Sequence, residues 1–189
     1  MRRRACSVLP AGGVITGVMA VSEAHAVDDF AARQIVEDVN AKSGQQLFGF
    51  ARRLGLRDDE AEDAVQEALL RLWRTIHEGT QLDSPVAWTF RTTYRLAMDR
   101  HRLGRRAQAL LDRFTTAHSD TANNADELVA VWSEVDRLPS RQRNVLYLRY
   151  RADLTFEAIA RVLDIEPSSA RSAAARGMAR LRVRLGPEA

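Results

Sequence analysis

The sequence predicts an all-α protein with two small helical domains joined by a flexible linker, the C-terminal domain being a helix-turn-helix. Three observations support this fold class. Apolar side chains follow helical spacing without a miss over residues 61–76. Residues 104–136 carry six acidic residues against three arginines, and residues 104–125 are polar and lose that periodicity. Residues 138–184 divide into three short helical segments separated by sharp breaks, and the last segment is rich in arginine.

Composition and charge limit the classes of function. The chain has 189 residues, of which 46% are hydrophobic and 6% aromatic, as is typical of a helical protein of one or two domains. From Arg137 onward there are eleven arginines and five acidic residues, which predicts a polyanionic partner for this end of the chain. Cys6 is the only cysteine, so the monomer can form neither a disulfide nor a cysteine-built metal site.

Residues 1–27 imitate a secretory signal, with three arginines, an apolar stretch and a small-residue motif at residues 24–26. Residues 10–13 break the apolar stretch, and a basic helix-turn-helix would find no nucleic acid outside the cytoplasm. We therefore expect a disordered extension or a start assigned too far upstream, with Met19 as an alternative start. We expect no membrane span and a cytoplasmic location.

The first domain is expected over residues 28–103. Its pattern predicts a helix over residues 29–41, a second helix capped by Ser43, and a third that begins near Asp58 and ends at Gly79. The third helix has a polar face opposite its apolar one. From the pattern alone, that face is either solvated or available to a partner. It carries Glu60, Glu62, Asp63, Gln66, Glu67, Arg71 and Arg74.

The last helix of this domain is expected from Pro85 to about Arg102, with Ser84 as its cap. Aromatic residues alternate with arginines along it. Such a helix suits single-stranded nucleic acid, because aromatic rings stack on bases while guanidinium groups hold the backbone. The alternative is that Trp88 and Phe90 belong to the core and the arginines form a solvated face.

A linker is expected over residues 104–125 and the second domain over residues 126–186. Ser140 and Thr155 are expected to cap two short helices. A third helix is expected to follow Pro167 and to run to about Arg184. A short helix, a turn and a basic helix form the element that places one helix in the major groove of DNA.

Three blocks of sequence together resemble the extracytoplasmic-function (ECF) group of bacterial RNA polymerase sigma factors. The first is AEDAVQEALLRLWR at residues 61–74. The second is AWTFR at residues 87–91 with LAMDR at residues 96–100. The third is LPSRQR at residues 138–143, continued through the helix-turn-helix. The resemblance covers about residues 30–185 and implies an alternative sigma factor that binds core RNA polymerase and directs promoter-specific initiation.

The resemblance also implies which residues contact each partner. Contacts to the duplex minus-35 element are expected from Ser168, Ser169, Arg171, Ser172, Arg176 and Arg180. Contacts to the single-stranded minus-10 element are expected from Trp88, Arg91, Tyr94, Arg95 and Arg100. Contacts to core polymerase are expected from Glu62, Asp63, Gln66, Glu67, Leu70, Trp73, Val145 and Leu148.

The chain departs from the family pattern at three places. Arg95 stands where an asparagine is usual, and Glu166 stands where a serine cap is common. Ala173 and Ala174 replace the arginine and leucine that the family often has, which suggests a recognition helix with one DNA contact fewer.

Other classes of function were compared with this one. A free-standing helix-turn-helix transcription regulator is the alternative, but it would need its own dimerisation helix or ligand domain. An enzyme is not expected, because the four histidines are scattered, no paired carboxylate sits beside a basic residue in a recognisable motif, and there is no glycine-rich phosphate loop. We expect no cofactor and no metal. An anti-sigma protein is a further expected partner.

Overall fold

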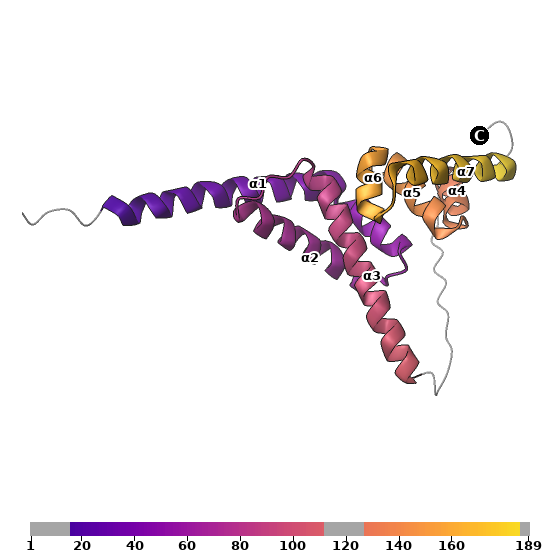
Figure 1. Ribbon diagram of the computed structural model, residues 1–189, viewed down its shortest axis with the longest axis horizontal. Coiled ribbons are helices and arrows are strands. Elements are labelled where there is room, and N and C mark those ends of the chain that lie inside the picture. The colour runs from indigo at the N-terminus through magenta and orange to yellow at the C-terminus, as the bar shows by residue number, and fades with distance from the viewer. Residues whose placement is uncertain (1–15, 112–126, 186–189) are drawn as a thin grey trace, which may run out of the picture.

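The protein is entirely helical over the residues that the computed structural model describes, which are 16–111 and 127–185, with side chains over 29–104 and 131–185 (Figure 1). This confirms the predicted fold class. The helices are α1 (Thr16–Arg53), α2 (Asp58–His77), α3 (Pro85–Leu111), α4 (Glu127–Asp136), α5 (Ser140–Tyr150), α6 (Phe156–Leu163) and α7 (Pro167–Leu185).

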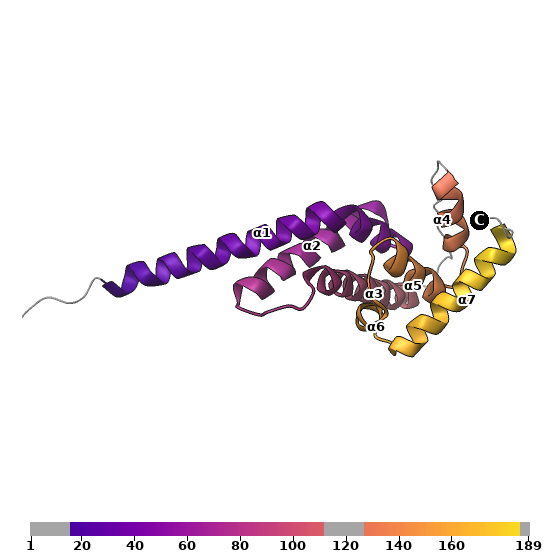
Figure 2. The same cartoon turned by 90° about the horizontal axis from the view of Figure 1, so that it is seen from above.

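The α1 helix is continuous where the sequence predicted two helices. The break at Ser43 is wrong, because Val39 and Leu47 lie about two turns apart and are both buried on one face. Packing of that face against α2 and α3 outweighs the low helix propensity of Gly44, which is about 1 kcal/mol. The helix also begins at Thr16, inside the expected disordered extension, and projects beyond the other helices (Figures 1 and 2). Residues 1–15 lie outside the described part.

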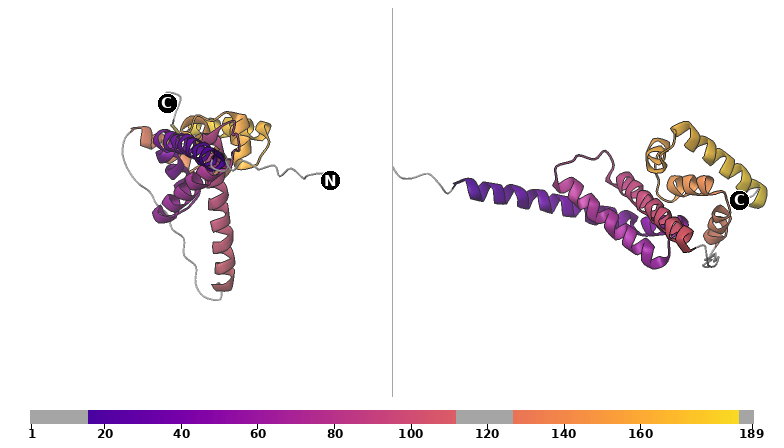
Figure 3. Two further views of the ribbon diagram at one scale, coloured as in Figure 1. Left: turned by 90° about the vertical axis from the view of Figure 1, so that its left-hand side faces the viewer. Right: turned by 60° about the horizontal axis from the view of Figure 1, so that its bottom comes forward.

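The α2 and α3 helices complete the N-terminal region. The α2 helix begins where Glu60 accepts a hydrogen bond of 2.9 Å from the backbone N–H of Arg57, and it buries the face predicted from its periodicity. Ser84 caps α3 as predicted, since its hydroxyl oxygen accepts from the N–H of Ala87 at 3.2 Å. The α3 helix continues to Leu111, past the expected end near Arg102, and its C-terminal turns extend away from the other helices (Figure 3). The linker expected at residue 104 therefore begins later, and residues 112–126 are not described.

The α5, α6 and α7 helices form the predicted helix-turn-helix region. Thr155 caps α6 by accepting a hydrogen bond of 3.2 Å from the N–H of Ala158. Asp164 ends α6 in the left-handed conformation, with φ of 55°, which aspartate tolerates better than most residues. Ser140 is not the cap of α5, because Pro139 occupies the N-cap position and makes no side-chain bond there.

The N-terminal helices and the C-terminal helices share one hydrophobic core. Phe50 of α1 meets Phe90 of α3 edge-on at 5.6 Å between ring centroids and stacks on Tyr147 of α5 at 5.9 Å. Helix α6 packs along α3, so the two regions lie side by side (Figures 1 and 2). The sequence predicted two domains joined only by a linker and gave no sign of this contact.

Replacing Leu72 with alanine tests the buried face of α2. Leu72 is fully buried, so Leu72→Ala should lower the free energy of unfolding by about 2 to 5 kcal/mol in urea denaturation. Leu70→Ala on the same helix is the control, because Leu70 is 42% exposed and its loss should change that free energy by less than about 0.5 kcal/mol. Equal effects would contradict the orientation of α2.

Candidate nucleic-acid and polymerase interfaces

The α7 helix separates small buried residues from exposed polar ones. Its inward face is built from Ala170, Ala173, Ala174, Gly177 and Leu181. A side chain at Gly177 would bring its Cβ to 2.9 Å from Cδ1 of Leu146, so glycine lets α7 approach α5 closely. The predicted minus-35 residues consequently lie on the outer face, where all are exposed except the half-buried Ser169.

Ala173 and Ala174 do not lie on the DNA-facing side of α7. They are 1% and 5% exposed and pack into the core of the helix-turn-helix. The expectation that they remove a DNA contact is therefore wrong. Period-3.6 spacing places them with Ala170 and Gly177, on the face where only small residues fit.

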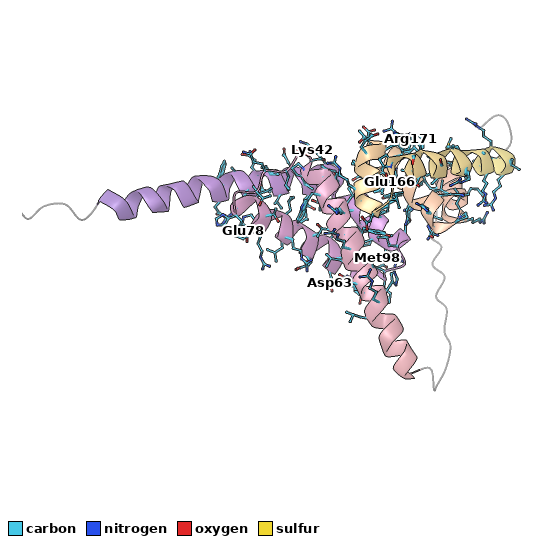
Figure 4. The ribbon with its side chains drawn as sticks, viewed as in Figure 1. Lys42, Asp63, Glu78, Met98, Glu166 and Arg171 are labelled. Carbon is cyan, nitrogen blue, oxygen red and sulfur yellow. The ribbon has the colours of Figure 1, made fainter. Side chains whose placement is uncertain are left out.

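Arg171 is held by a carboxylate of the preceding helix. Its guanidinium lies 2.9 Å from Oε1 of Glu157 on α6, at the N-terminal end of α7 shown with Glu166 in Figure 4. The pKa of Glu157 is lowered by a hydrogen bond from its own backbone N–H and then by the bond from Arg171. Glu157 is a site residue that the sequence did not predict, because no pattern links two side chains fourteen positions apart.

The other arginines of this face differ in their partners. Arg180 donates to Oε1 of Gln142 on α5 at 3.2 Å. Arg176 is exposed and makes no ion pair with the residues that the structure describes. Of the arginines predicted to contact bases, Arg176 can bind DNA directly, whereas Arg171 must first break its ion pair with Glu157.

Four of the five predicted minus-10 residues line grooves between α3 and α6. Trp88 and Arg91 line a cavity together with Asp83 and Arg161, beside the N-terminus of α3. Tyr94 and Arg95 line a second groove whose far wall is formed by α6 and the turn that follows it. Trp88, Arg91 and Tyr94 are half-buried, while Arg95 is exposed. Phe90 is a core residue, as the alternative interpretation of this helix proposed.

Arg100 contacts α2, unlike the other four residues that were predicted to bind the minus-10 element. Its guanidinium donates to the backbone carbonyl of Glu60 and lies 3.6 Å from Oδ2 of Asp63, both on α2. This side chain ties α3 to α2, and its expected contact with the minus-10 strand is not supported by its position.

The predicted polymerase face of α2 is largely accessible. Glu62, Asp63, Gln66 and Leu70 are exposed, and Asp63 is marked on α2 in Figure 4. Glu67 is half-buried, with its carboxylate 2.7 Å from Nε of Arg71. Trp73 stacks on His77 with the ring centroids 5.0 Å apart. Helix α2 packs on α1 and α3, so this face lies free of the helix-turn-helix.

Val145 and Leu148 are not surface residues. Both are fully buried in the core, so the expectation that they contact polymerase is wrong. The α5 helix buries a run of residues from Asn144 to Leu148, because α1, α4, α6 and α7 all pack around it. Its pattern therefore gave no way to tell an inward side chain from an outward one.

A metal site and a membrane-spanning helix are both absent from the described part of the chain. No three His, Cys, Asp or Glu side chains gather there to form a metal site. No helix within residues 16–111 or 127–185 is long and apolar enough to cross a membrane.

Both regions match known protein families. Residues 41–107 match Sigma-70 region 2, and residues 128–181 match Sigma-70, region 4. The chain is 30% identical, over 138 residues, to the ECF RNA polymerase sigma factor SigK of Mycobacterium ulcerans, with 67% of this chain and 73% of that protein covered.

Two solved structures are similar in fold. One is the sigma factor RpoE in complex with the anti-sigma factor NepR from Bartonella quintana, with a TM-score of 0.63 and 21% identity. The other is CnrH in complex with the cytosolic domain of CnrY, with a TM-score of 0.54 and 23% identity. Each comparison covers 86% of this chain and 99% of the other chain.

An NMR titration tests the pairing of Glu157 with Arg171. The pKa of the Glu157 carboxyl should lie below its ordinary value in the native protein. Arg171→Ala should raise that pKa only part of the way, because the bond from the backbone N–H of Glu157 remains. An unchanged pKa in Arg171→Ala would show that the two side chains do not pair in solution.

Proposed function

This chain belongs to the ECF group of sigma-70 family RNA polymerase sigma factors, and from that premise we propose that α7 reads the minus-35 element while α3 opens and reads the minus-10 element. The observation that carries the function is the presence of both sigma-70 regions in order along one chain. The protein is thus a sigma factor that binds RNA polymerase and directs transcription initiation, and it is not an enzyme. Because the chain belongs to this family, the alternative function of a free-standing helix-turn-helix regulator is set aside.

The exposed face of α7 supports the minus-35 assignment. Ser168, Arg171 and Ser172 lie in its first two turns, and residues near the N-terminus of such a helix reach base edges in the major groove. Arginine can bond O6 and N7 of guanine together. We assign base reading to Arg171 and, one turn on, a base or phosphate contact to Arg176. Ser169 and Arg180 lie at the margins of this face, where phosphate contacts fit best.

The α3 face supports the minus-10 assignment. Trp88 and Tyr94 are ring systems on which unpaired bases can stack, and Arg91 and Arg95 lie beside them to hold the backbone. All four project from the same stretch of one helix, so a single strand running along α3 would meet them in turn.

The exposed face of α2 supports docking on core polymerase. Glu62, Asp63 and Gln66 form an acidic and polar strip, with Leu70 as an exposed apolar contact and Glu67 and Trp73 at its edge. An apolar contact within a polar rim is the usual composition of a protein interface.

A cytoplasmic location and an anti-sigma partner belong to the same proposal. Core polymerase and promoter DNA are found in the cytoplasm. Both structural relatives were solved in complexes, one of them with a named anti-sigma factor. We propose that this chain is also held by a protein of that class.

Run-off transcription tests the proposed function. Purified core polymerase is supplied with genomic fragments, with and without this protein, and the transcripts are mapped. We expect new start sites that depend on the protein and share two sequence elements upstream. Transcripts that are identical with and without the protein would overturn the proposal.

Arg171→Ala should relax the preference at one minus-35 position. We expect a loss of about 1 to 3 kcal/mol in holoenzyme affinity for the preferred base, measured by competition binding on promoters substituted at each position. Arg182→Ala is the matched control, since Arg182 is exposed near the end of α7 and should weaken binding uniformly or not at all. A loss in Arg171→Ala that is the same for every promoter would assign Arg171 to a phosphate.

Tyr94→Ala should impair strand opening. Loss of one stacked base should weaken the open complex by about 1 to 3 kcal/mol, measured by permanganate reactivity of unpaired thymines. Tyr94→Phe keeps the ring and should open strands nearly as well as the native protein. Equal loss in the two variants would assign the role to the hydroxyl group instead, and no loss in Tyr94→Ala would exclude this residue.

A further inference from the structure

An acidic side chain lies beside the arginine to which we assign base reading. Glu157 stands in the first turn of α6, and its Oε1 accepts a hydrogen bond of 2.9 Å from Nη1 of Arg171 on α7. The Glu157 side chain is 60% exposed and the Arg171 side chain 54%. Among residues 131–185, Glu157 is the only carboxylate that pairs with an arginine of the predicted minus-35 set.

The carboxylate of Glu157 is held in place by its own helix as well as by Arg171. Its pKa is lowered first by a hydrogen bond from the backbone N–H of Glu157 and then by the bond from Arg171. A negative charge in the first turn of a helix is also favoured by the helix dipole. The carboxylate therefore remains ionised at the same place when Arg171 turns away from it.

Stability of the fold does not explain this ion pair. A pair between two exposed side chains contributes little to folding, and the Thr155 hydroxyl caps α6 independently of it. On a DNA-binding surface a carboxylate repels the phosphates, which provide most of the non-specific affinity. A hydrogen-bond donor on the DNA would offset that repulsion at one kind of site only.

The major groove offers a carboxylate one kind of partner. Its donors are the amino groups, N6 of adenine and N4 of cytosine, and glutamate typically accepts from N4 of cytosine. Arg171 is assigned to O6 and N7 of a guanine, and the paired cytosine holds its N4 about 2.9 Å from that O6, the length of an ordinary hydrogen bond. The same distance, 2.9 Å, separates Nη1 of Arg171 from Oε1 of Glu157. The two side chains thus match the spacing of one G·C pair.

We propose that Glu157 reads the cytosine paired with the guanine that Arg171 reads, so that the two side chains together recognise one G·C base pair of the minus-35 element. When Arg171 turns to the guanine, the Glu157 carboxylate accepts a hydrogen bond from the cytosine amino group. No other base pair presents two neighbouring acceptors followed by a donor in this order. The proposal rests on the proposed function, because it requires α7 to enter the major groove of that element.

N4-methylcytosine gives a direct test of this contact. Its methyl group replaces the amino hydrogen that faces the major groove, while the other hydrogen still pairs with guanine. Each minus-35 cytosine of either strand is replaced in turn, in a promoter mapped by run-off transcription, and holoenzyme affinity is measured by competition binding. We expect a loss of about 10-fold at one cytosine, as is typical for a hydrogen bond to a charged group. That cytosine should lie in the base pair at which Arg171→Ala relaxes the preference.

Glu157→Ala should abolish the sensitivity to this methyl group. The variant should bind the methylated and unmodified promoters equally and should tolerate other base pairs at that position. Glu166→Ala is the matched control, because Glu166 is an exposed acidic residue beside the start of α7 and its removal changes the net charge equally (Figure 4). Glu166→Ala should keep the full loss on methylation. Circular dichroism establishes that both variants are folded.

Three results would overturn the assignment of Glu157. One is a native protein that is insensitive to methylation of every minus-35 cytosine. Another is an equal loss in the native protein and Glu157→Ala, because the loss would then come from the size of the methyl group. The third is tighter binding of every promoter by Glu157→Ala with unchanged base preference, since Glu157 would then act only by repelling phosphates.

Failure of this assignment is distinguishable from failure of the proposed function. If the native protein gives no sigma-dependent transcripts, the proposed function fails and the assignment of Glu157 falls with it. If transcripts are found and Arg171→Ala relaxes one minus-35 position while Glu157→Ala relaxes none, only the reading of cytosine by Glu157 fails.

Discussion

The cluster of Phe90, Phe50 and Tyr147 is the contact on which the arrangement of this molecule depends. Phe50 and Phe90 are fully buried, and Phe50 contacts a ring from each of the two regions. Because Tyr147 sits in the middle of α5, the stack fixes that helix against α1. Helix α6 consequently packs on α3, and the polar face of the recognition helix α7 is exposed to solvent. The placement of the α7 surface relative to the α3 surface depends on this aromatic cluster and on the packing of α6 against α3.

The recognition helix shows how packing assigns residues to function. Close approach of α7 to α5 requires small side chains, and alanine and glycine fill the inner face for that reason. All five arginines of α7 lie outside that buried face, where they form the basic surface that a polyanion requires. The Glu157 carboxylate holds Arg171 at the start of this surface. Its presence there means that Arg171 gives up a charged acceptor when it binds a neutral base edge, which favours discrimination between bases over raw affinity.

The sequence predicted the helices and caps that depend on neighbouring residues, but it did not predict contacts between residues far apart in the chain. Helical periodicity located α2 and α3, and the caps at Ser84 and Thr155 were correct, because each depends on residues within one turn. The break at Ser43 was wrong because tertiary packing overrides a weak local preference. Val145 and Leu148 were misplaced on the surface, since a helix surrounded by neighbours has no polar face to orient it. The Tyr147 contact joins positions too far apart for any spacing rule.

The polar and aromatic contacts between the two regions are individually weak. A hydrogen bond contributes about 0.5 to 1.5 kcal/mol, an aromatic pair about as much, and a partly exposed ion pair such as Arg53 with Asp136 less than about 1 kcal/mol. Burial of the apolar core that the two regions share, with α6 packed on α3, therefore contributes most of what holds them side by side.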